Sequence, residues 1–457
     1  MSAPLSLAQH LAALAVRQPA AAALHHGGQT WTFRQLADWA AAAAPPLVAL
    51  PQAIVGLAAD APALALAAVA CSAADRALWP LEPNAPAERR RDWAALGGAA
   101  VAWLDALPAA AAPGRHQGFP APVAADRPAL VIGTSGSEGR PKAVVLSHAN
   151  LDAAAAAANR CLPLNPGDCW LDCLPLYHVG GLAILWRCWR AGATVLLHDG
   201  FNAAAVGRDL ASRGVTHLSL VPAMLAALLD RGIAPPASLR GVLVGGAALS
   251  RPLYDRAQAR GWPLLPTYGM SETAAQVATR TPDAGPWREG DVGHPLPGNR
   301  LALDAAGRIR IGGPQVMRGY LTPDLAPGLG LDDGWLTSGD LGRIEPDGRL
   351  VVLGRADDML VSGGRNVHPA EVEAGLAGCP GVDDVAVTGL PDPVWGDTVV
   401  ALVVGPVSDA TLRDWSRTHL PGAARPRRIV RLPALPRNAM GKLERQALRA
   451  LAAGNPP

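Results

Sequence analysis

Apolar positions near the start of the chain recur at helical spacing. Leu7, Leu11 and Leu14 fall on one helical face, which predicts an opening helix with a buried side. Thr32 has a side chain suited to capping, so a second helix is expected over residues 33–44. The pattern therefore begins with two amphipathic helices.

Farther along, short apolar runs alternate with helical stretches, and this alternation favours parallel sheets covered by helices. Strands are expected at residues 53–58, 129–132, 143–146, 170–174, 193–198, 215–221, 241–244, 264–266 and 350–353. Helices are expected at residues 62–73, 153–158 (capped by Asn150 or Asp152), 182–190, 203–212, 223–230 and 251–259. Residues 108–122 are rich in Pro, Ala and Gly, which is typical of a linker. The predicted class is α/β.

Composition excludes some functions. The chain has 457 residues, too many for one core, so two or three domains are expected. Its 40 basic and 38 acidic side chains give a charge of +2 without a basic tract, which argues against nucleic-acid binding. The six cysteines are scattered, and Cys169 and Cys173 are the only close pair. Buried thiols in a reducing cytoplasm are favoured, with a zinc site as the less favoured alternative.

No targeting or membrane segment is expected. The N-terminus lacks an early positive region, and Arg17 interrupts its apolar stretch, unlike a signal peptide. Residues 39–59 form an uncharged run of nearly membrane-spanning length, but Pro45, Pro46 and Pro51 should divide it into a helix, a turn and a buried strand. A cytoplasmic protein without a membrane span is expected.

A polar loop between two expected strands is the first candidate site. It runs from Thr134 to Lys142 and contains three hydroxyls and two glycines, namely Thr134, Ser135, Ser137, Gly136 and Gly139. Closely spaced amides and hydroxyls form a concavity for anions, and a lysine adds a point charge suited to phosphate. The loop differs from the Walker loop because Pro141 precedes the lysine and Ala143 follows it. An ordinary polar hairpin is the alternative.

Two glycine-rich segments directly follow expected strands, at residues 245–247 and 268–273. In open parallel sheets, ligands bind beyond the carboxyl ends of the strands. Both segments are therefore candidates for contacting a nucleotide, and ordinary β-to-α turns are the alternative.

Seven motifs occur together in a fixed order: TSGSEGRPK, LPLYHVGGL, VGGAAL, YGMSETA, SGDLGRIEPDG, LGRADDMLVSGGRNVHPAEVE and LPRNAMGKLER. This ordered set, from about Leu130 onwards, resembles the adenylate-forming (acyl-CoA synthetase, AMP-binding) superfamily. The resemblance implies a carboxylic acid–CoA ligase that uses ATP and Mg²⁺. It would form an acyl-adenylate and pyrophosphate, then transfer the acyl group to the thiol of coenzyme A.

The resemblance also implies residue roles. Lys142 and the loop hydroxyls would hold the β- and γ-phosphates, while Glu272 and Thr134 would contact Mg²⁺. The nucleotide would be bound by Gly246, Tyr268, Gly269, Asp340 and Arg355. Carboxylate oxygens suit Mg²⁺, and an aspartate suits the donors of ribose.

The resemblance further implies two lobes that move relative to each other. A large N-terminal domain with parallel sheets is expected over residues 1–353 and a small mobile α+β lid over 354–457. Lys442 in the lid would bridge the acid and the α-phosphate. The lid would then rotate about Asp357 to present residues 362–364 for thioester formation. His178 would lie beside the acyl pocket, and a core histidine is an equal alternative.

Within this superfamily, sequence segments such as YGMSETAAQVATRTP are most similar to the o-succinylbenzoate–CoA ligases of menaquinone synthesis. The alternatives are a ligase for another aryl or acyl acid, one that loads a carrier protein, or a degenerate nucleotide-binding scaffold. Glu138, Ala143 and Ser338 depart from the usual family residues, and none of these changes removes a charge that the chemistry needs.

Overall fold

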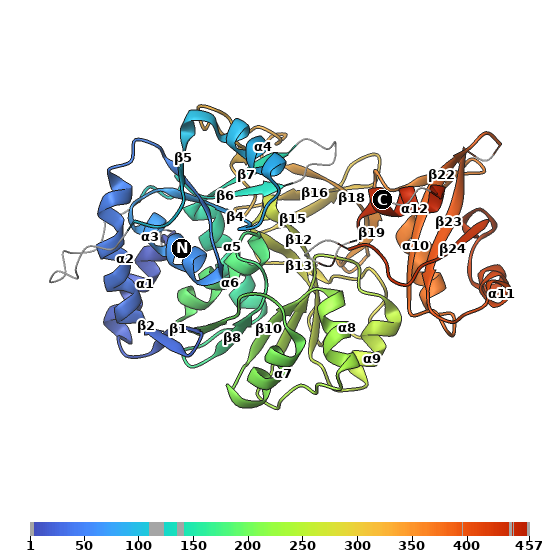
Figure 1. The fold of residues 1–457 in the computed structure, drawn as a ribbon, viewed down its shortest axis with the longest axis horizontal. Coiled ribbons are helices and arrows are strands. Elements are labelled where there is room, and N and C mark those ends of the chain that lie inside the picture. Colours follow the sequence, from blue (N-terminus) through green and yellow to red (C-terminus); the bar gives the residue numbers. More distant parts are fainter. Residues whose placement is uncertain are drawn as a thin grey trace.

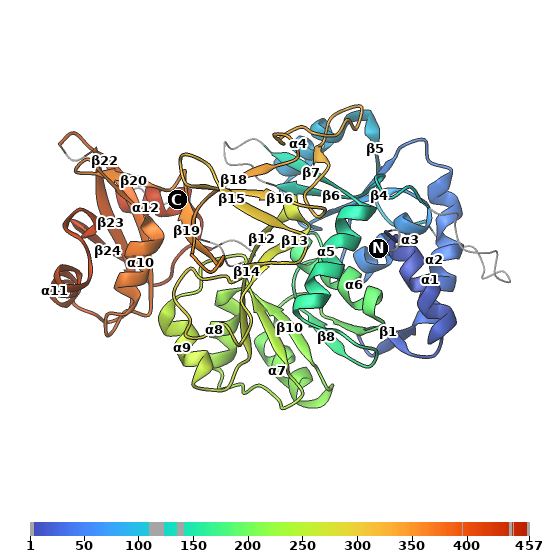
Figure 2. The same ribbon diagram turned by 180° about the vertical axis from the view of Figure 1, so that it is seen from behind.

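The protein is described by a computed structural model that covers residues 4–108, 123–134, 141–394, 396–437, 441 and 443–454. In Figure 1 a smaller orange-to-red lobe lies beside the larger part of the chain. Figure 2 shows the same two bodies from behind, with β19 (Leu350–Arg355) near their junction.

The first large layer is a nine-stranded sheet with the order β14-β13-β12-β11-β10-β8-β9-β1-β2. Neighbouring strands from β12 to β1 are parallel, whereas β13, β14 and β2 add antiparallel edges. The strands are β1 (Ala22–His26), β2 (Gln29–Thr32), β8 (Cys169–Asp172), β9 (Thr194–Leu197), β10 (His217–Leu220), β11 (Gly241–Val244), β12 (Leu264–Met270), β13 (Ala275–Thr279) and β14 (His294–Pro295).

The second layer is a six-stranded sheet with the order β17-β7-β6-β4-β3-β5. It is parallel from β6 to β5 and antiparallel across β6, β7 and β17. The strands are β3 (Ile54–Ala58), β4 (Ala77–Leu81), β5 (Val101–Leu104), β6 (Pro128–Thr134), β7 (Lys142–Ser147) and β17 (Gly319–Tyr320).

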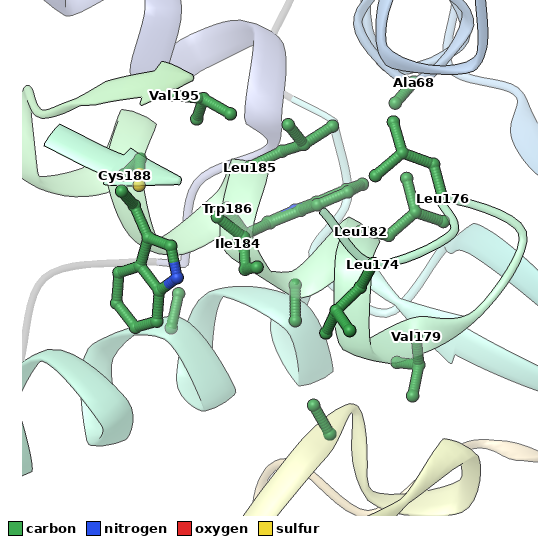
Figure 3. Close-up of a cluster of buried hydrophobic side chains, with 14 of the residues drawn as sticks. Ala68, Leu174, Leu176, Val179, Leu182, Ile184, Leu185, Trp186, Cys188 and Val195 are labelled. Carbon is green, nitrogen blue, oxygen red and sulfur yellow. The ribbon is translucent and has the colours of Figure 1, made fainter. Parts of the chain in front are cut away.

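Helices fill the space between these sheets and cover their outer faces. Helix α5 (His148–Cys161) contacts β6, β7 and β13, so it lies between the two layers. Helix α6 (Val179–Ala191) packs beside it, and Figure 3 shows its Leu182, Ile184 and Trp186 in the shared apolar core. The remaining helices of this part are α1 (Leu7–Arg17), α2 (Phe33–Val48), α3 (Ala61–Ala73), α4 (Ala87–Gly97), α7 (Ala203–Ser212), α8 (Pro222–Asp230) and α9 (Arg251–Gln258), with the short 3-10 turn η1 (Gly98–Ala100).

A smaller antiparallel sheet leads to the terminal lobe. Its order is β15-β16-β18-β19, with β15 (Arg300–Leu303), β16 (Arg308–Gly312) and β18 (Leu336–Ile344). The lobe beyond β19 contains β20 (Leu360–Ser362), β21 (Arg365–Val367), α10 (Pro369–Ala377), β22 (Asp384–Asp392), β23 (Gly396–Val404), α11 (Asp409–His419), η3 (Gly422–Ala424), β24 (Arg428–Arg431) and α12 (Arg445–Ala453).

The terminal lobe has its own apolar core. Alternate residues of β23 point to opposite faces, as expected for a strand. Val399, Ala401 and Val403 join one cluster with α10 and α11, whereas Val400 and Leu402 join another with α12. The predicted α/β class, with parallel sheets flanked by helices and a smaller second lobe, is confirmed.

Local side-chain chemistry explains where helices begin. Thr32 caps α2 as predicted, through a reciprocal capping box with Gln35. The cap predicted for α5 was wrong, because Ser147 takes that position. Asn150 lies in the first turn and completes the box, and Asp152 is occupied by an ion pair with Arg190.

The prolines after residue 44 do not end the helix as predicted. Helix α2 continues through Pro45 and Pro46 to Val48. Both prolines lie in the last turn, where few main-chain bonds remain to be lost, and the Ala49 amide still donates to the Pro45 carbonyl. The next residue, Leu47, is fully buried, and its packing stabilises the turn.

The segment YGMSET does not form a β-to-α turn. The strand expected at residues 264–266 extends to Met270 as β12, and after the 3-10 turn η2 (Ser271–Thr273) the chain returns antiparallel as β13. A bulge at Tyr268 and Gly269 brings the strands so close that a Cβ on Gly269 would collide with the Ala275 carbonyl. Glycine is therefore required there by packing.

Three other expectations concern the whole chain. Residues 109–122 of the expected linker lie outside the described residues. Among the described residues, no helix combines the length and apolar character needed to cross a bilayer. All six cysteines are free thiols, five of them buried, and the described residues contain no group of three or more His, Cys, Asp or Glu side chains that could hold a metal.

Candidate active site

The predicted site residues gather where the three sheets of the larger part meet. Tyr268 lies on β12 of the nine-stranded sheet, and Asp340 lies on β18 of the four-stranded sheet. Lys142 begins β7 of the six-stranded sheet. Residues remote in sequence are thus brought to one junction.

Tyr268 and Asp340 are joined by a direct hydrogen bond. The Tyr268 hydroxyl donates to Asp340 Oδ2 over 2.7 Å, and the amide of Asp340 donates to Ser338 Oγ over 3.1 Å. Burial, followed by the neighbouring Asp340 carboxylate, raises the pKa of Tyr268 well above its ordinary value. The phenol therefore stays protonated and acts as a donor.

Arg355 lies opposite Asp340 in the β18–β19 ladder. Its Nη1 is 3.6 Å from Asp340 Oδ1, and its Nε donates to Asp357 Oδ1 over 3.0 Å. One guanidinium therefore links the expected ribose aspartate to the expected hinge residue.

Glu272 and Lys142 come together around Tyr320, a residue that sequence reasoning missed. The Tyr320 hydroxyl donates to Glu272 Oε1 over 3.0 Å, and Lys142 Nζ lies 5.2 Å from the centre of the same ring. Among the residues that the structure describes, Glu272 has no ion-pair partner and Lys142 has no carboxylate partner. A carboxylate without an ion-pair partner can bind a hard cation such as Mg²⁺, and a lysine without a carboxylate partner can bind phosphate.

The polar loop itself lies mostly outside the described residues, which exclude Ser135, Gly136, Ser137, Glu138 and Gly139. Its two ends are placed, because Thr134 pairs with Lys142 in the β6–β7 hairpin and its hydroxyl donates to the Lys142 carbonyl over 3.3 Å. The end of the hairpin that carries Thr134 and Lys142 therefore lies beside Tyr320, which bonds Glu272.

The other glycine segment lies at the carboxyl end of β11. Gly246 is exposed and has a φ of +78°, a conformation that favours glycine. The parallel pairing of β11 with β12 places this turn beside the strand that carries Tyr268.

A cavity of about 630 Å³ opens at the carboxyl ends of strands from both large sheets. Its lining includes Leu176 and Tyr177 and, from the terminal lobe, Arg437 and Gly441. His178 follows at the start of α6, and its ring centre lies 4.8 Å from that of Tyr177. The cavity lining includes Tyr177 but not His178, so the expected acyl-pocket histidine lies one residue from the cavity wall.

The terminal lobe reaches this cavity through the segment that precedes Lys442. A Cβ on Gly441 would lie 3.2 Å from both Ala223 Cβ and Val221 Cγ2, so the two lobes are in close contact there. Arg437 donates to the Gly441 carbonyl over 2.9 Å and pairs with Asp384. Lys442 lies outside the described residues.

Arg445 is a second residue that sequence reasoning missed. Its Nη1 lies 2.7 Å from Glu373 Oε1 in α10, and its Nε lies 3.2 Å from Asp358 Oδ2 in the expected hinge. Asp357 is therefore held by Arg355 on one side, and Asp358 by Arg445 on the other. The motifs contained both arginines, but only their folded positions reveal these partners.

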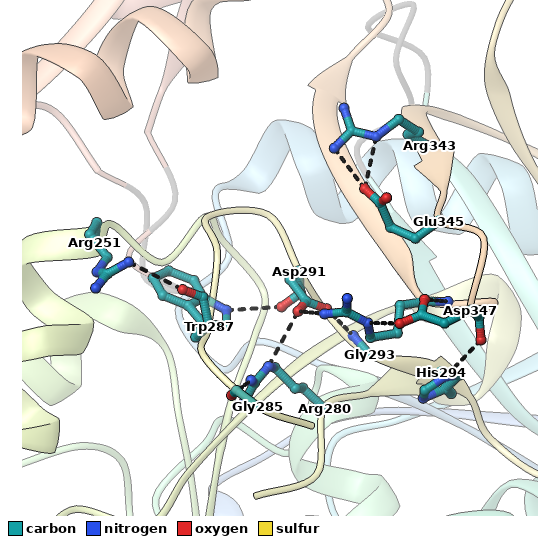
Figure 4. Close-up of polar contacts among 11 residues, drawn as sticks. Arg251, Arg280, Gly285, Trp287, Asp291, Gly293, His294, Arg343, Glu345 and Asp347 are labelled. Atoms are coloured by element: carbon teal, nitrogen blue, oxygen red, sulfur yellow. Dashed lines mark hydrogen bonds and ion pairs between the residues drawn. The ribbon is translucent and has the colours of Figure 1, made fainter. Parts of the chain in front are cut away.

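A buried ion cluster fixes β19, the strand that ends at Arg355. Asp291 is almost fully buried and lies 3.3 Å from Arg280 Nε and 2.7 Å from Arg349 Nη1. Figure 4 shows this cluster, in which Asp291 also accepts from the Gly293 amide over 2.9 Å. The cluster links the end of β13 to the start of β19, and so joins the nine-stranded sheet to the four-stranded sheet.

The boundary between lobes also holds a perturbed carboxyl group. The pKa of Glu289 is raised to about 7, mainly by burial. A hydrogen bond from the Arg251 backbone and the charge of Arg251 oppose this shift, and the charge of Glu373 in the terminal lobe adds to it. Glu289 therefore changes charge near neutral pH.

Comparisons with known proteins agree with the site. The AMP-binding enzyme family model matches residues 98–321, and the model of the AMP-binding enzyme C-terminal domain matches residues 371–442. A 2-succinylbenzoate–CoA ligase of Bacillus cereus is 37% identical over 334 residues, which are 70% of this chain and 69% of the relative. The chain belongs to the AMP-binding enzyme family. The resemblance inferred from the ordered motifs is confirmed.

Solved structures of AMP-binding enzymes extend this result to nearly the whole chain. The o-succinylbenzoate CoA synthetase (MenE) of Bacillus subtilis in complex with the acyl-adenylate intermediate OSB-AMP has a TM-score of 0.86 and 30% identity, covering 96% of this chain and 97% of that one. The same synthetase in complex with ATP and magnesium gives the same TM-score and identity, covering 96% and 99%. ATP-bound MatB of Rhodopseudomonas palustris has a TM-score of 0.83 and 25% identity, covering 97% and 98%.

Proposed function

We propose that this protein is a 2-succinylbenzoate–CoA ligase that forms an acyl-adenylate from the acid and ATP and then an acyl-CoA thioester. The observation that carries the proposal is the match of 96% of the chain to a synthetase solved with its acyl-adenylate. The shared identity of 37% with a curated ligase of this activity supports it. ATP, Mg²⁺ and coenzyme A are the implied small molecules, and the cytoplasm is the proposed location.

The nucleotide would bind across Tyr268, Asp340 and Arg355. Asp340 accepts a hydrogen bond from Tyr268 and lies 3.6 Å from Arg355 Nη1, and its remaining lone pairs can accept from ribose hydroxyls. Gly246 is exposed and follows β11, the strand that pairs with β12, so a flat base would pack between this turn and Tyr268.

The phosphates would bind between Lys142, the loop that contains Ser135, Gly136, Ser137 and Gly139, and the metal site. Glu272 would hold Mg²⁺, with Thr134 as a second oxygen donor. The absence of an ion-pair partner for Glu272 among the described residues fits this role. Bound Mg²⁺ would neutralise phosphate charge, which lowers the repulsion between the triphosphate and the acid.

Lys442 would complete the site for the first half-reaction. It directly follows Gly441, which contacts the rim of the cavity. A lysine there would stabilise the charge shared by the acid carboxylate and the α-phosphate. Removing one such stabiliser costs roughly 10²–10³-fold in rate.

The cavity suits the carbon skeleton of an organic substrate. Its volume of about 630 Å³ lies within the usual range for small-molecule sites, and Leu174, Leu176 and Met224 give it apolar walls. We assign His178 to a position next to its wall, where a histidine would orient the acyl group rather than bind phosphate.

The second half-reaction would require rotation of the terminal lobe, for which we propose a boundary at residues 353 and 354. Arg355 bonds Asp357 and Arg445 bonds Asp358. The chain would pivot about Asp357, which Arg355 holds at the end of β19, while Arg445 of α12 holds the neighbouring Asp358.

ATP–pyrophosphate exchange across a panel of carboxylic acids tests this function. We expect 2-succinylbenzoate to give the largest kcat/KM, and the mass of the final product to match its CoA thioester. If only a different aryl or acyl acid supported exchange, 2-succinylbenzoate would be refuted as the substrate. A product found only on a carrier protein would refute CoA as the acceptor, and no exchange with any acid would indicate a nucleotide-binding scaffold.

A further inference from the structure

Tyr320 contacts both residues to which the metal and phosphate roles are assigned. Its hydroxyl donates to Glu272 Oε1 over 3.0 Å, and Lys142 Nζ lies 5.2 Å from its ring centre. Glu272 belongs to η2, which joins β12 and β13 of the nine-stranded sheet, whereas Lys142 belongs to β7 of the six-stranded sheet. Tyr320 is the side chain that physically connects them.

The structure holds Tyr320 firmly in this position. Tyr320 pairs with Val144 in the β17–β7 ladder, two residues from Lys142, and its amide donates to the Leu329 carbonyl over 2.9 Å. The ring also packs closely on Gly330, where an added Cβ would lie 2.5 Å from Tyr320 Cε2. The ring therefore has little freedom to turn away.

The main chain around Glu272 is tied to the same segment. The Met317 amide, three residues before Tyr320, donates to the Glu272 carbonyl over 2.8 Å. Ala274 and Ala275, which follow η2, have φ values of +51° and +92°. Non-glycine residues rarely adopt such angles, and they persist where the surroundings fix the backbone.

We propose that Tyr320 is a positioning residue that orients Glu272 toward the metal and Lys142 toward the phosphates. This inference rests on the proposed function. The phenol occupies Oε1 of the carboxylate, which leaves Oε2 as the oxygen that can turn to a cation. The electron-rich ring face holds the ammonium group without neutralising it, because a ring carries no net charge.

The phenol hydroxyl of Tyr320 has one proton to donate, and the geometry directs it to Glu272 Oε1. Partners of this kind that orient a metal ligand usually change metal affinity by about 10- to 100-fold when they are removed. A tyrosine that serves only as packing would have no such effect.

Two substitutions separate the contacts. Y320F removes the bond to Glu272 but keeps the ring beneath Lys142, whereas Y320L removes both. Y254F is the matched control, because Tyr254 also packs against a neighbouring side chain, its ring centre lying 4.2 Å from that of Trp287. The melting temperature reports whether each variant is folded, and metal-free ATP binding is a second report for Y320F, which keeps the ring beside Lys142.

The test measures Mn²⁺ binding in the presence of a non-hydrolysable ATP analogue, by the loss of the free-ion electron paramagnetic resonance signal. We expect Y320F to raise the Kd for Mn²⁺ by about 10-fold with unchanged metal-free ATP binding. Y320L should also weaken metal-free ATP binding by about 2- to 5-fold, and Y254F should match the wild type.

The outcomes distinguish this inference from the function on which it rests. Wild-type Mn²⁺ affinity in Y320F would overturn the role of Tyr320 and leave the proposed function standing. A wild-type protein that binds no metal–nucleotide complex would overturn both. A loss in Y320F restored by millimolar Mn²⁺ supports positioning, whereas an equal loss of metal-free ATP binding in Y320F would show that the residue acts only through folding.

Discussion

Replacing Asp291 with asparagine should destabilise the larger lobe strongly. The substitution keeps the shape of the side chain but removes its charge. Arg280 has only 3% of its side chain exposed and Arg349 has 21%, so both would face each other with no counter-charge between them. Breaking a buried ion pair from one side costs about 3–5 kcal/mol.

We place D291N near the lower end of this range. Water can reach Arg349, which also pairs with Asp347, and the asparagine oxygen can still accept from the Gly293 amide. A loss of about 3 kcal/mol corresponds to a fall in Tm of roughly 4 °C, because an unfolding entropy of about 2.1 cal/mol/K per residue gives about 0.7 kcal/mol/K for a lobe of about 350 residues. Differential scanning calorimetry measures this shift.

D347N provides the matched control. Asp347 pairs with the same Arg349 over 2.7 Å, but 51% of its side chain is exposed. An exposed pair contributes about 0–1 kcal/mol, so the Tm of D347N should change by less than about 1.5 °C. If D291N and D347N melted within one degree of each other, the reasoning from burial would be refuted.

Three further predictions concern the site and the lobe boundary. K442A should lower ATP–pyrophosphate exchange by about 10²–10³-fold but leave thioester formation from supplied acyl-adenylate nearly unchanged, and equal losses in both assays would contradict the rotation. Y268F leaves Asp340 without its phenol donor, which should cost about 1–2 kcal/mol in the free energy of unfolding measured in urea, and an unchanged midpoint would contradict it. Because burial raises the pKa of Glu289 from 4.5 to about 7, its stabilising effect is complete below about pH 4.5 and declines as pH rises to 7. E289Q should abolish this part of the pH dependence of Tm, and an identical pH profile would show that Glu289 is not linked to folding.

Much of the larger lobe was predictable because its signals are local. The helix at residues 203–212 and the strand at 241–244 have the predicted bounds. Apolar spacing and flanking polar residues determine such elements within a few neighbours. The order of motifs likewise predicted the family, because each motif is a short contiguous stretch.

The wrong predictions depended on contacts between distant residues. Asn150 had the chemistry of a cap, but its amide instead donates to the carbonyls of Pro314 and Val316. The antiparallel return after Met270 depends on pairing with β13 and on the fit of Gly269, neither of which has a local signature. The antiparallel strand β13 was therefore not foreseen.

The candidate site shows the same division. Charged residues inside motifs were proposed as site residues from the sequence, including Glu272 and Asp340. Tyr320 was missed because its bond to Glu272 spans 48 residues and lies outside every motif considered. Tyr320 is identified only in the folded chain, by its contact with the expected acidic ligand Glu272.

The contact of Gly441 with Val221 and Ala223 bears on how well the reaction intermediate is protected from water. Part of the cavity wall belongs to the terminal lobe, so the proposed rotation would leave the cavity closed only while the mixed anhydride forms. The same rotation would admit water together with the thiol. Thiolysis would then compete with hydrolysis of the anhydride, and slow binding of the thiol would consume ATP without product.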